Sequence, residues 1–352
     1  MEVGYQVVQV VPRDSMDLQD QWKFQLKQFT ESRDAGFDMY CWAHHYLIDP
    51  FQHFQPFPIL SRLAAEPGNM KLATSILVLP LLNPVDVAEQ AATLDHISGG
   101  RFTLGVGLGY RPEECEAFGT KMAERGARTK ESLEIIKKLW TEDNVTHNGR
   151  FWQITDAKPT ARPYQKPHLP VWQAAMSDPA VKRVAEAGDI LYIGPANSYS
   201  TIKRHVELYH ETLQANDKEH PGDMVVVREF YAGNTRQEAL DKARWGFKKK
   251  YDVYAMHGMH GVEPELVEKV APMQGTSSGT GDSELETLMD DTFILGSGEE
   301  CVEQIGKYRD LGFTHIALRL FYPGMSETQT LEHIEYVGRN ILPTVQKILL
   351  VG

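Results

Sequence analysis

The chain lacks any apolar run long enough to span a bilayer, and it lacks a basic amino-terminal segment followed by an apolar core. The first absence predicts no transmembrane helix, and the second predicts no signal peptide. Cysteine is scarce: Cys41, Cys115 and Cys301 are the three in the sequence, and their spacing matches no metal or redox motif. An odd count fits a reducing compartment, so we expect a cytoplasmic protein.

An excess of positive charge is also missing. Asp and Glu number 48 against 36 Lys and Arg, which gives a net charge of −12 at pH 7. Nucleic acid and anionic membrane surfaces repel such a chain, so we expect neither as a partner. The hydrophobic content of 42% and charged content of 24% are typical of a globular protein, and 352 residues suffice for one large α/β barrel or two ordinary domains.

What the sequence does have is a glycine-rich stretch at residues 97–119. A short apolar run, 102–106, predicts a strand, and Gly105, Gly107 and Gly109 alternate through its end. Three glycines two positions apart would leave a flat floor at the carboxyl end of this strand, where a flat or anionic ligand could lie. Glycines that only ease the packing of strands are the alternative interpretation.

A helix is predicted to follow this strand, because Pro112 with Glu113 and Glu114 suits a first helical turn. The letters GVGLG partly resemble a dinucleotide fingerprint. Tyr110, however, stands where the third glycine is needed, and the acidic residues at the distance of a ribose partner lie within a predicted helix. These departures argue against a Rossmann dinucleotide site.

Strands and helices alternate along the whole chain, with a hairpin at 145–154 that turns at Asn148-Gly149. We expect one α/β domain over residues 1–352, a (β/α)8 barrel with insertions; a doubly wound open sheet is the competing architecture. The predicted strands are 3–10, 38–42, 71–79, 102–106, 171–175, 190–194, 224–231 and 314–320. The predicted helices are 17–33, 57–66, 84–94, 130–140, 179–187, 200–214, 235–250, 299–311 and 327–346.

In a barrel, the residues that contact ligands lie at the carboxyl ends of the strands. The predicted ends would then meet at one mouth. They are His44-His45, Ser75-Ile76, Gly107 to Arg111, Met176-Ser177 and Gly194-Pro195.

Residues 252–291 interrupt the alternation just before the last helix-strand-helix unit. Their middle, 275–283, is nearly all glycine, serine and threonine, which cannot bury enough apolar surface to order itself alone. Long insertions of this kind are often functional, so we expect a lid that closes over the barrel mouth. A passive insertion is the alternative. The apolar residues that could cover a substrate are Tyr254, Met256, Met259, Val262 and Leu266.

Four segments resemble the bacterial luciferase-like flavin monooxygenases, and they run in the family's order. The most specific is LATSILVLPLLNPVDVAEQAATLDHISGGRFTLGVGLGYRPEECEAFG. The others are GFDMYCWAHHY, LPVWQAAMS and ILGSGEECVEQIGKYRDLGFTHIALRLF. The resemblance implies a (β/α)8 barrel that binds reduced FMN, or in some branches the deazaflavin F420, at its mouth.

Site residues follow from this resemblance position by position. His44 matches the family's catalytic histidine, and the Ser75-Ile76 bond matches a non-prolyl cis peptide beneath the flavin ring. The stretch that would line the flavin is Gly107, Leu108, Gly109 and Tyr110, with Gly194 also assigned to the cofactor.

The flavin phosphate is expected at Met176 and Ser177, through a backbone amide and a hydroxyl. The chain departs from luciferase at two positions in the glycine-rich stretch. Leu108 replaces an arginine that holds the phosphate, and Arg111 is the candidate substitute; Gly107 stands where luciferase has a reactive cysteine.

The resemblance implies a two-component monooxygenase. Reduced FMN would come from a separate flavin reductase and react with O2 to give a C4a-hydroperoxide that oxygenates a small organic substrate. An F420-dependent hydride-transfer enzyme and a non-catalytic flavin-binding protein are the alternatives. A homodimer is expected, with helix 84–94 in the interface. The sequence does not identify the substrate.

A histidine suits the proton transfers of such a reaction. For His44 the alternative is a hydrogen-bonded structural imidazole, and His45 fits a structural or pocket-lining residue better. A zinc site built from His44, His45 and His53 is not expected, because no carboxylate or cysteine completes a recognisable ligand spacing.

Overall fold

The computed structural model describes residues 1–7, 9–244, 246 and 291–347. The chain forms two compact units: unit 1 comprises Met1–Tyr40 and the chain from Gln173 onward, and unit 2 comprises Cys41–Trp172. The boundaries cut through two strands, β2 (Met39–Trp42) and β8 (Val171–Ala174), so each unit contains part of both.

The fold class is the expected (β/α)8 barrel. The parallel strands run in the order β1, β2, β3, β5, β8, β9, β10, β12, and β12 pairs with β1, so the sheet closes on itself. A doubly wound sheet is open and has an unpaired strand at each of its two edges. The closed strand order excludes that architecture.

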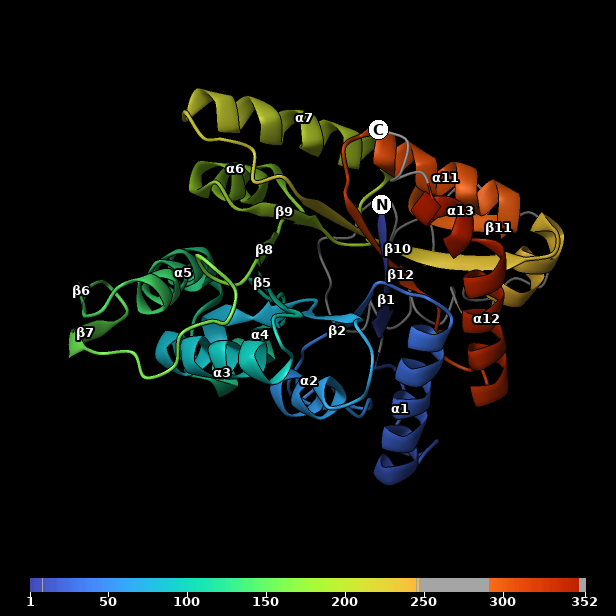
Figure 1. Cartoon of the computed structure of the whole chain (residues 1–352), viewed down its shortest axis with the longest axis horizontal. Helices are drawn as coiled ribbons and strands as arrows, with labels where there is room; N and C mark the ends of the chain where they lie inside the picture. The colour runs from blue at the N-terminus through green and yellow to red at the C-terminus, as the bar shows by residue number, and fades with distance from the viewer. Residues whose placement is uncertain (8, 245, 247–290, 348–352) are drawn as a thin grey trace. The chain divides into compact units, whose positions relative to one another are not determined.

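In unit 2, helices alternate with the barrel strands along the chain (Figure 1). In the hairpin, β6 and β7 are antiparallel. The elements are α2 (Pro56–Ala64), β3 (Lys71–Thr74), β4 (Leu77–Val78), η1 (Leu79–Leu81), α3 (Pro84–Ile97), β5 (Phe102–Gly107), α4 (Pro112–Ala117), η2 (Met122–Glu124), α5 (Arg125–Thr141), β6 (Val145–Asn148) and β7 (Gln153–Ala157).

Unit 1 begins with β1 (Glu2–Val7) and α1 (Leu18–Asp34) and resumes after β8. Residues 236–244 are helical, and the chain is next described from residue 291. The later elements are α6 (Asp178–Ala187), β9 (Ile190–Ile193), α7 (Tyr199–Ala215), β10 (Met224–Gly233), β11 (Phe293–Ser297), α11 (Gly298–Asp310), β12 (His315–Arg319), α12 (Glu327–Asn340) and α13 (Leu342–Lys347).

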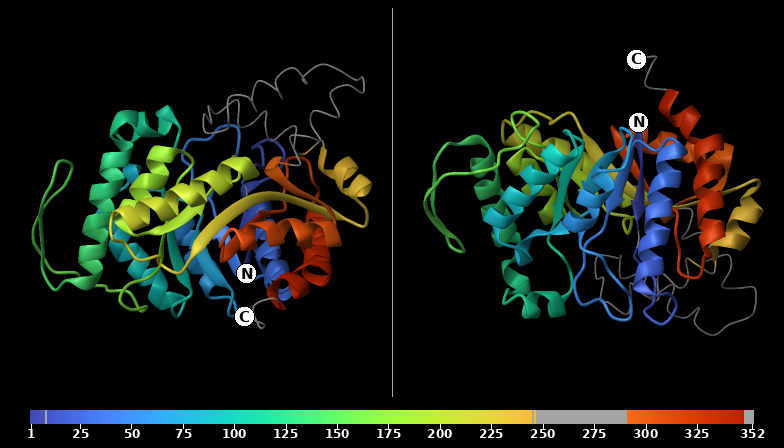
Figure 2. Two further views of the ribbon diagram at one scale, coloured as in Figure 1. Left: turned by 90° about the horizontal axis from the view of Figure 1, so that it is seen from above. Right: turned by 60° about the horizontal axis from the view of Figure 1, so that its bottom comes forward.

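Local sequence explains how these helices begin and pack. Asp17 caps α1, since its side chain accepts a hydrogen bond from the Gln19 amide. The buried face of α1 presents Phe24 and Phe29 to the interior, and α1 lies beside α12 in unit 1 (Figures 1 and 2). In the chain, these helices follow β1 and β12, two strands that pair with each other.

Three details differ from the sequence prediction. The strand expected at 71–79 is divided into β3 and β4, and the helix expected at 327–346 is interrupted at Ile341, where a proline at 343 suits the first turn of a new helix. β11 was not predicted, because a five-residue strand beside an irregular composition has no periodicity of its own. It pairs in parallel with the second half of β10.

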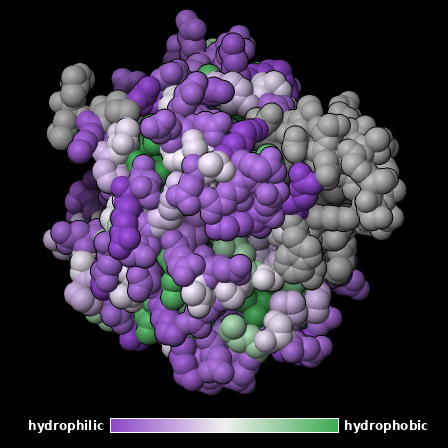
Figure 3. All heavy atoms as spheres, turned by 90° about the vertical axis from the view of Figure 1, so that its right-hand side faces the viewer, coloured by the Kyte–Doolittle hydropathy of each residue, from purple (hydrophilic) through white to green (hydrophobic). Residues whose placement is uncertain are grey.

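The lid hypothesis concerns residues 252–291, and all but the last of these lie outside the described residues, as do His257 and His260. The lid therefore stays a prediction. Within the described ranges, no helix is long and apolar enough to cross a membrane. On the side of the molecule where α12 lies, the described side chains form a mostly hydrophilic surface with small hydrophobic patches (Figure 3).

Candidate active site

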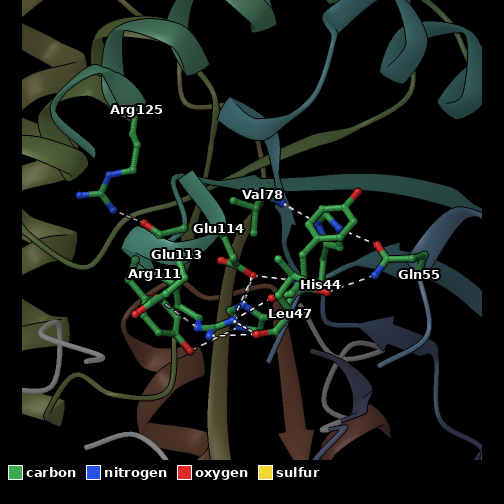
Figure 4. Close-up of polar contacts among 12 residues, drawn as sticks. His44, Leu47, Gln55, Val78, Arg111, Glu113, Glu114 and Arg125 are labelled. Atoms are coloured by element: carbon green, nitrogen blue, oxygen red, sulfur yellow. Dashed lines mark hydrogen bonds and ion pairs between the residues drawn. The ribbon is translucent and has the colours of Figure 1, made fainter. Parts of the chain in front are cut away.

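The first candidate residue, His44, follows β2 directly and is 2% exposed. Both of its ring nitrogens are engaged within unit 2 (Figure 4). The Val78 amide donates to Nδ1 at 3.1 Å, and Nε2 lies 2.9 Å from Gln55 Oε1. Because an amide N–H can only donate, Nδ1 must be the acceptor, and Nε2 carries the proton that Gln55 Oε1 accepts.

This bonding pattern describes a neutral imidazole in one tautomer. Burial lowers the pKa of His44 to about 4, and the neighbouring His45 adds to the effect. The amide of Gln55 is oriented in turn, since its Nε2 donates to the His45 carbonyl at 3.1 Å. These contacts are those of the structural imidazole weighed above, and the catalytic role of His44 stays a prediction.

His45 has different partners. Its Nδ1 lies 3.1 Å from Glu114 Oε1, and its Nε2 lies 3.4 Å from the Tyr110 hydroxyl. The side chain of His45 is 17% exposed, whereas that of Glu114 is 1% exposed. An imidazole between a buried carboxylate and a phenol is an arrangement that can exchange protons.

Glu114 is held in place from several sides. Its Oε1 also accepts from the Tyr46 amide at 2.7 Å, and Arg111 Nη1 lies 3.8 Å away. Burial raises the pKa of Glu114, but its bonds to His45 and Tyr46 and the charge of Arg111 outweigh burial and leave the pKa below its usual value. Glu114 is therefore an ionised carboxylate near neutral pH.

Arg111, the predicted substitute for the phosphate arginine, has most of its donors engaged here. Nη1 donates to the carbonyls of Tyr46 at 2.7 Å and Leu47 at 3.2 Å, and Nη2 donates to Leu47 at 3.2 Å. Its side chain is only 6% exposed. The guanidinium fixes the loop after β2, where Leu47 has a positive φ of 50°; this is an alternative to holding a phosphate.

The glycines after residue 104 do not leave the flat, open surface at the end of β5 that their spacing predicted. A Cβ at Gly105 would lie 2.1 Å from the Thr74 carbonyl oxygen, and a Cβ at Gly109 would lie 2.6 Å from a Val78 methyl. Neighbouring strands thus fill the space beside two of the three glycines, as in the packing interpretation. Gly107 is the last residue of β5 and is buried. Leu108 and Tyr110, which follow it in the chain, are half-buried.

The Ser75-Ile76 peptide bond is cis, as the resemblance implied. Ser75 is 3% exposed, and its amide donates to the Trp42 carbonyl at 2.7 Å. Ile76 packs with Tyr46 against a buried cluster that includes Val78. In unit 2 the structure thus brings His44, Ser75, Ile76, Tyr110 and Arg111 to the carboxyl ends of β2, β3 and β5.

The remaining candidates form a second group in unit 1, at the ends of β8 and β9. Ser177 is the N-cap of α6, and its hydroxyl makes no capping hydrogen bond, so this hydroxyl could donate to an anionic group. The first turn of the helix offers little more, because Pro179 has no amide hydrogen and the amides of Ala180 and Val181 donate to the Ser177 carbonyl. Gly194 leaves room for the side chain of Met176, because a Cβ at this position would lie 3.3 Å from the Met176 sulfur. Of these two features, the Ser177 hydroxyl is the one that fits a phosphate.

Sequence reasoning missed several polar residues. It took Glu114 for a helix-start residue and did not notice Gln55, although both bond the histidines. In unit 1, Arg319 donates to Gln6 at 2.5 Å and lies 3.1 Å from Glu229. Polar residues inside strand patterns were the available signal for this second network. Among the described residues, no cluster of three or more His, Cys, Asp or Glu could hold a metal ion.

With this geometry established, comparison with known proteins is informative. The family model described as luciferase-like monooxygenase matches residues 1–315. The chain therefore belongs to the luciferase-like monooxygenase family.

Relatives in the family differ in the flavin they use. An F420-dependent glucose-6-phosphate dehydrogenase of Amycolatopsis mediterranei is 24% identical and covers 99% of both chains. An FMNH2-dependent dimethylsulfone monooxygenase of Pseudomonas putida is 26% identical over 81% of this chain and 77% of the relative. Among solved structures, the monooxygenase RslO1 of Streptomyces bottropensis superposes with a TM-score of 0.82 at 21% identity, over 98% of this chain and 99% of the other, which shows the shared fold.

Proposed function

We propose that this protein is a flavin-dependent oxidoreductase that uses reduced FMN from a separate reductase, together with O2, to oxygenate a small organic substrate. The observation that carries the proposal is the group of ionisable side chains at the ends of β2 and β5, in a chain of this family. The FMNH2-dependent relative supports this cofactor.

In unit 2, the residues proposed to contact a flavin ring are Ser75, Ile76 and residues 107–110. In unit 1, the residues proposed to bind a phosphate group are Met176, Ser177 and Gly194. Reduced flavin supplies the electrons. The protein binds and orients it, excludes water and moves protons, and the histidines after β2 are the candidate groups for the last task.

A second function is favoured by a specific observation, the F420-dependent relative that matches the chain from end to end. That enzyme would transfer hydride between F420 and an organic substrate and would need no O2. The same barrel ends and the same histidines would serve it.

Anaerobic titration with FMNH2 and with reduced F420, followed by fluorescence, separates the two. Micromolar affinity for FMNH2, with affinity for F420 at least about tenfold weaker, which is 1.4 kcal/mol, supports the first function. The reverse order supports the second. Binding of neither would contradict both, and binding without any turnover on a substrate panel supports a non-catalytic flavin carrier.

We also propose that the protein is a cytoplasmic homodimer whose interface includes α3. Two apolar side chains of this helix, Val85 and Ile97, are 36% and 51% exposed. Isolated exposed apolar residues are common, but they are the positions at which a helix can gain from a partner.

A further inference from the structure

The two adjacent histidines of unit 2 differ in what their nitrogens can do. His44 is bonded to a backbone amide and to the Gln55 carboxamide, and neither group takes up or gives up a proton near neutral pH. His45 is bonded to the Glu114 carboxylate and to the Tyr110 hydroxyl. Only the second imidazole therefore stands in a chain of groups that can exchange protons.

Glu114 also fixes the tautomer of His45. An ionised carboxylate only accepts, so Nδ1 must donate to it, and Nε2 is left with a lone pair directed at the Tyr110 hydroxyl. When Nε2 gains a proton, the buried carboxylate 3.1 Å from the ring stabilises the resulting charge. A carboxylate that orients an imidazole and stabilises its protonated form is the arrangement of a hydrolase triad, here with a phenol in the outer position.

The charged and titratable groups around His45 come from three segments. Glu114 and Arg111 approach from the start of α4, and Tyr110 approaches from the end of β5. The ring of His53 is centred 5.8 Å away, and His44 and Tyr46 flank His45 in the chain. Glu114 is the carboxylate in direct contact with the His45 ring, and Arg111 Nη1, 3.8 Å from the same carboxylate oxygen, carries the opposite charge.

We propose that His45, positioned by Glu114, is the residue that moves protons at the flavin site, with the Tyr110 hydroxyl between His45 Nε2 and the reacting atoms. His44 is then a positioning residue, which ties the loop after β2 to Val78 and, through Gln55, to the His45 carbonyl. This inference rests on the proposed function, and both branches of that function need a proton moved.

The simplest reaction that contains this step is the reoxidation of reduced FMN without an organic substrate. FMNH2 and O2 give FMN and H2O2: two electrons pass from the flavin to oxygen, and the two hydrogens of the flavin appear in the peroxide. With FMNH2 bound, the Tyr110 hydroxyl and His45 Nε2 would take up the proton that the flavin releases and would return it to the peroxide product, so no further reactant is needed.

The test uses the full-length protein with FMNH2 as the probe. Enzyme loaded anaerobically with FMNH2 is mixed with O2 in a stopped-flow instrument between pH 5.5 and 9.5, and the return of flavin absorbance gives the rate. The variants are H45Q, H44Q, E114Q, Y110F and, as a matched control beside His45, H53Q. Circular dichroism and the affinity for FMNH2 are measured for each, so that loss of fold or binding is recognised.

For the wild-type protein, we expect the plot of the reoxidation rate against pH to bend within the measured range. H45Q should bind FMNH2 within about threefold of wild type but should reoxidise it about 10²-fold more slowly, and its plot should show no bend. Y110F should slow the reaction with the bend retained. E114Q should slow the reaction, because the protonated imidazole loses its counter-charge. H53Q should match wild type, and H44Q should keep the bend.

An H45Q variant with an unaltered rate and pH profile overturns the inference, as does loss of the bend in a folded H44Q variant but not in H45Q. If E114Q does not fold, the comparison of H45Q with H53Q still decides the question. Failure of the wild-type protein to bind either FMNH2 or reduced F420 is a different result, since it removes the proposed function itself.

Discussion

Gly105 is the residue at which β5 has least room. The Thr74 carbonyl oxygen occupies the place of its side chain, and the Thr74 hydroxyl both accepts from the Gly105 amide at 2.9 Å and donates to the Gly105 carbonyl at 2.8 Å. A backbone oxygen cannot turn aside as the end of a side chain can. This glycine therefore fixes how closely β3 and β5 approach one another.

We expect Gly105→Ala to lower the free energy of unfolding by about 3 kcal/mol or more, because the strand must move to admit the methyl group. Gly306→Ala in α11 is the matched control, since its nearest neighbour to a Cβ is an Arg309 nitrogen at 3.8 Å. In a helix interior, alanine should stabilise by about 0.5–1 kcal/mol. Urea unfolding of both variants measures the two effects, and equal values would contradict this account of Gly105.

At the scale of elements, the hairpin of β6 and β7 depends on one carboxylate of α5. Glu131 accepts from the amides of Phe151 and Trp152, and His147 Nε2 lies 3.2 Å from it. Arg128, from the same helix, lies 5.0 Å from the centroids of both the Phe151 and Trp152 rings. The turn at 149–152 is thus bound to α5, although the hairpin strands are largely exposed.

Glu131→Ala should loosen this hairpin, because two backbone donors lose their acceptor at a cost of about 1–3 kcal/mol each if they stay buried. Hydrogen exchange at the amides of 145–157 should rise by at least about tenfold, and trypsin should cut at Arg150 first. Lys138→Ala, two turns further along α5, removes the basic member of an exposed pair with Glu134 and is the control. Equal exchange in both variants would show that Glu131 does not hold the hairpin.

The elements also show what a sequence can specify. Short apolar runs predicted the eight barrel strands to within a few residues, because these strands are buried along almost their whole length. β11 and the early start of α5 at Arg125 were missed, since neither has a strong pattern. The partners of a side chain depend on which strand ends lie together, so the sequence identified His44 and Tyr110 but could not show that Glu114 bonds His45 and leaves His44 to Gln55.

At the scale of the whole molecule, two buried histidines make stability depend on pH. Burial lowers the pKa of His44 and of His333 to about 4, against an ordinary value of 6.5. Between these values the unfolded chain binds more protons than the folded chain. Stability is therefore fully present above pH 6.5 and is lost as the pH falls toward 4.

Each histidine should contribute up to roughly 3 kcal/mol to this loss. The urea midpoint should fall steeply from pH 6.5 to 4.5, and His333→Gln should reduce that slope. His96→Gln, at an exposed position in α3, should leave the slope unchanged. A midpoint that is flat over this range would contradict the neutral, buried state of both rings.

The proposed dimer gives a second prediction at this scale. The double variant Val85→Glu with Ile97→Glu places two charges on the exposed side of α3, so it should convert a dimer to a folded monomer at micromolar concentration. Leu18→Glu, at a comparably exposed apolar residue in α1, is the control. Sedimentation velocity measures the outcome, and a wild-type monomer would refute the dimer.

The unpredicted strand β11 has a consequence for engineering. It is registered against β10 over five residues, from Glu229 beside Phe293 to Gly233 beside Ser297, and α11 follows with a complete capping box at Ser297 and Glu300. The chain thus re-enters the sheet at a position that its own backbone pairing defines. A segment grafted ahead of Asp291 therefore joins a strand whose register on β10 is already set, and the alignment of the strands does not have to be redesigned.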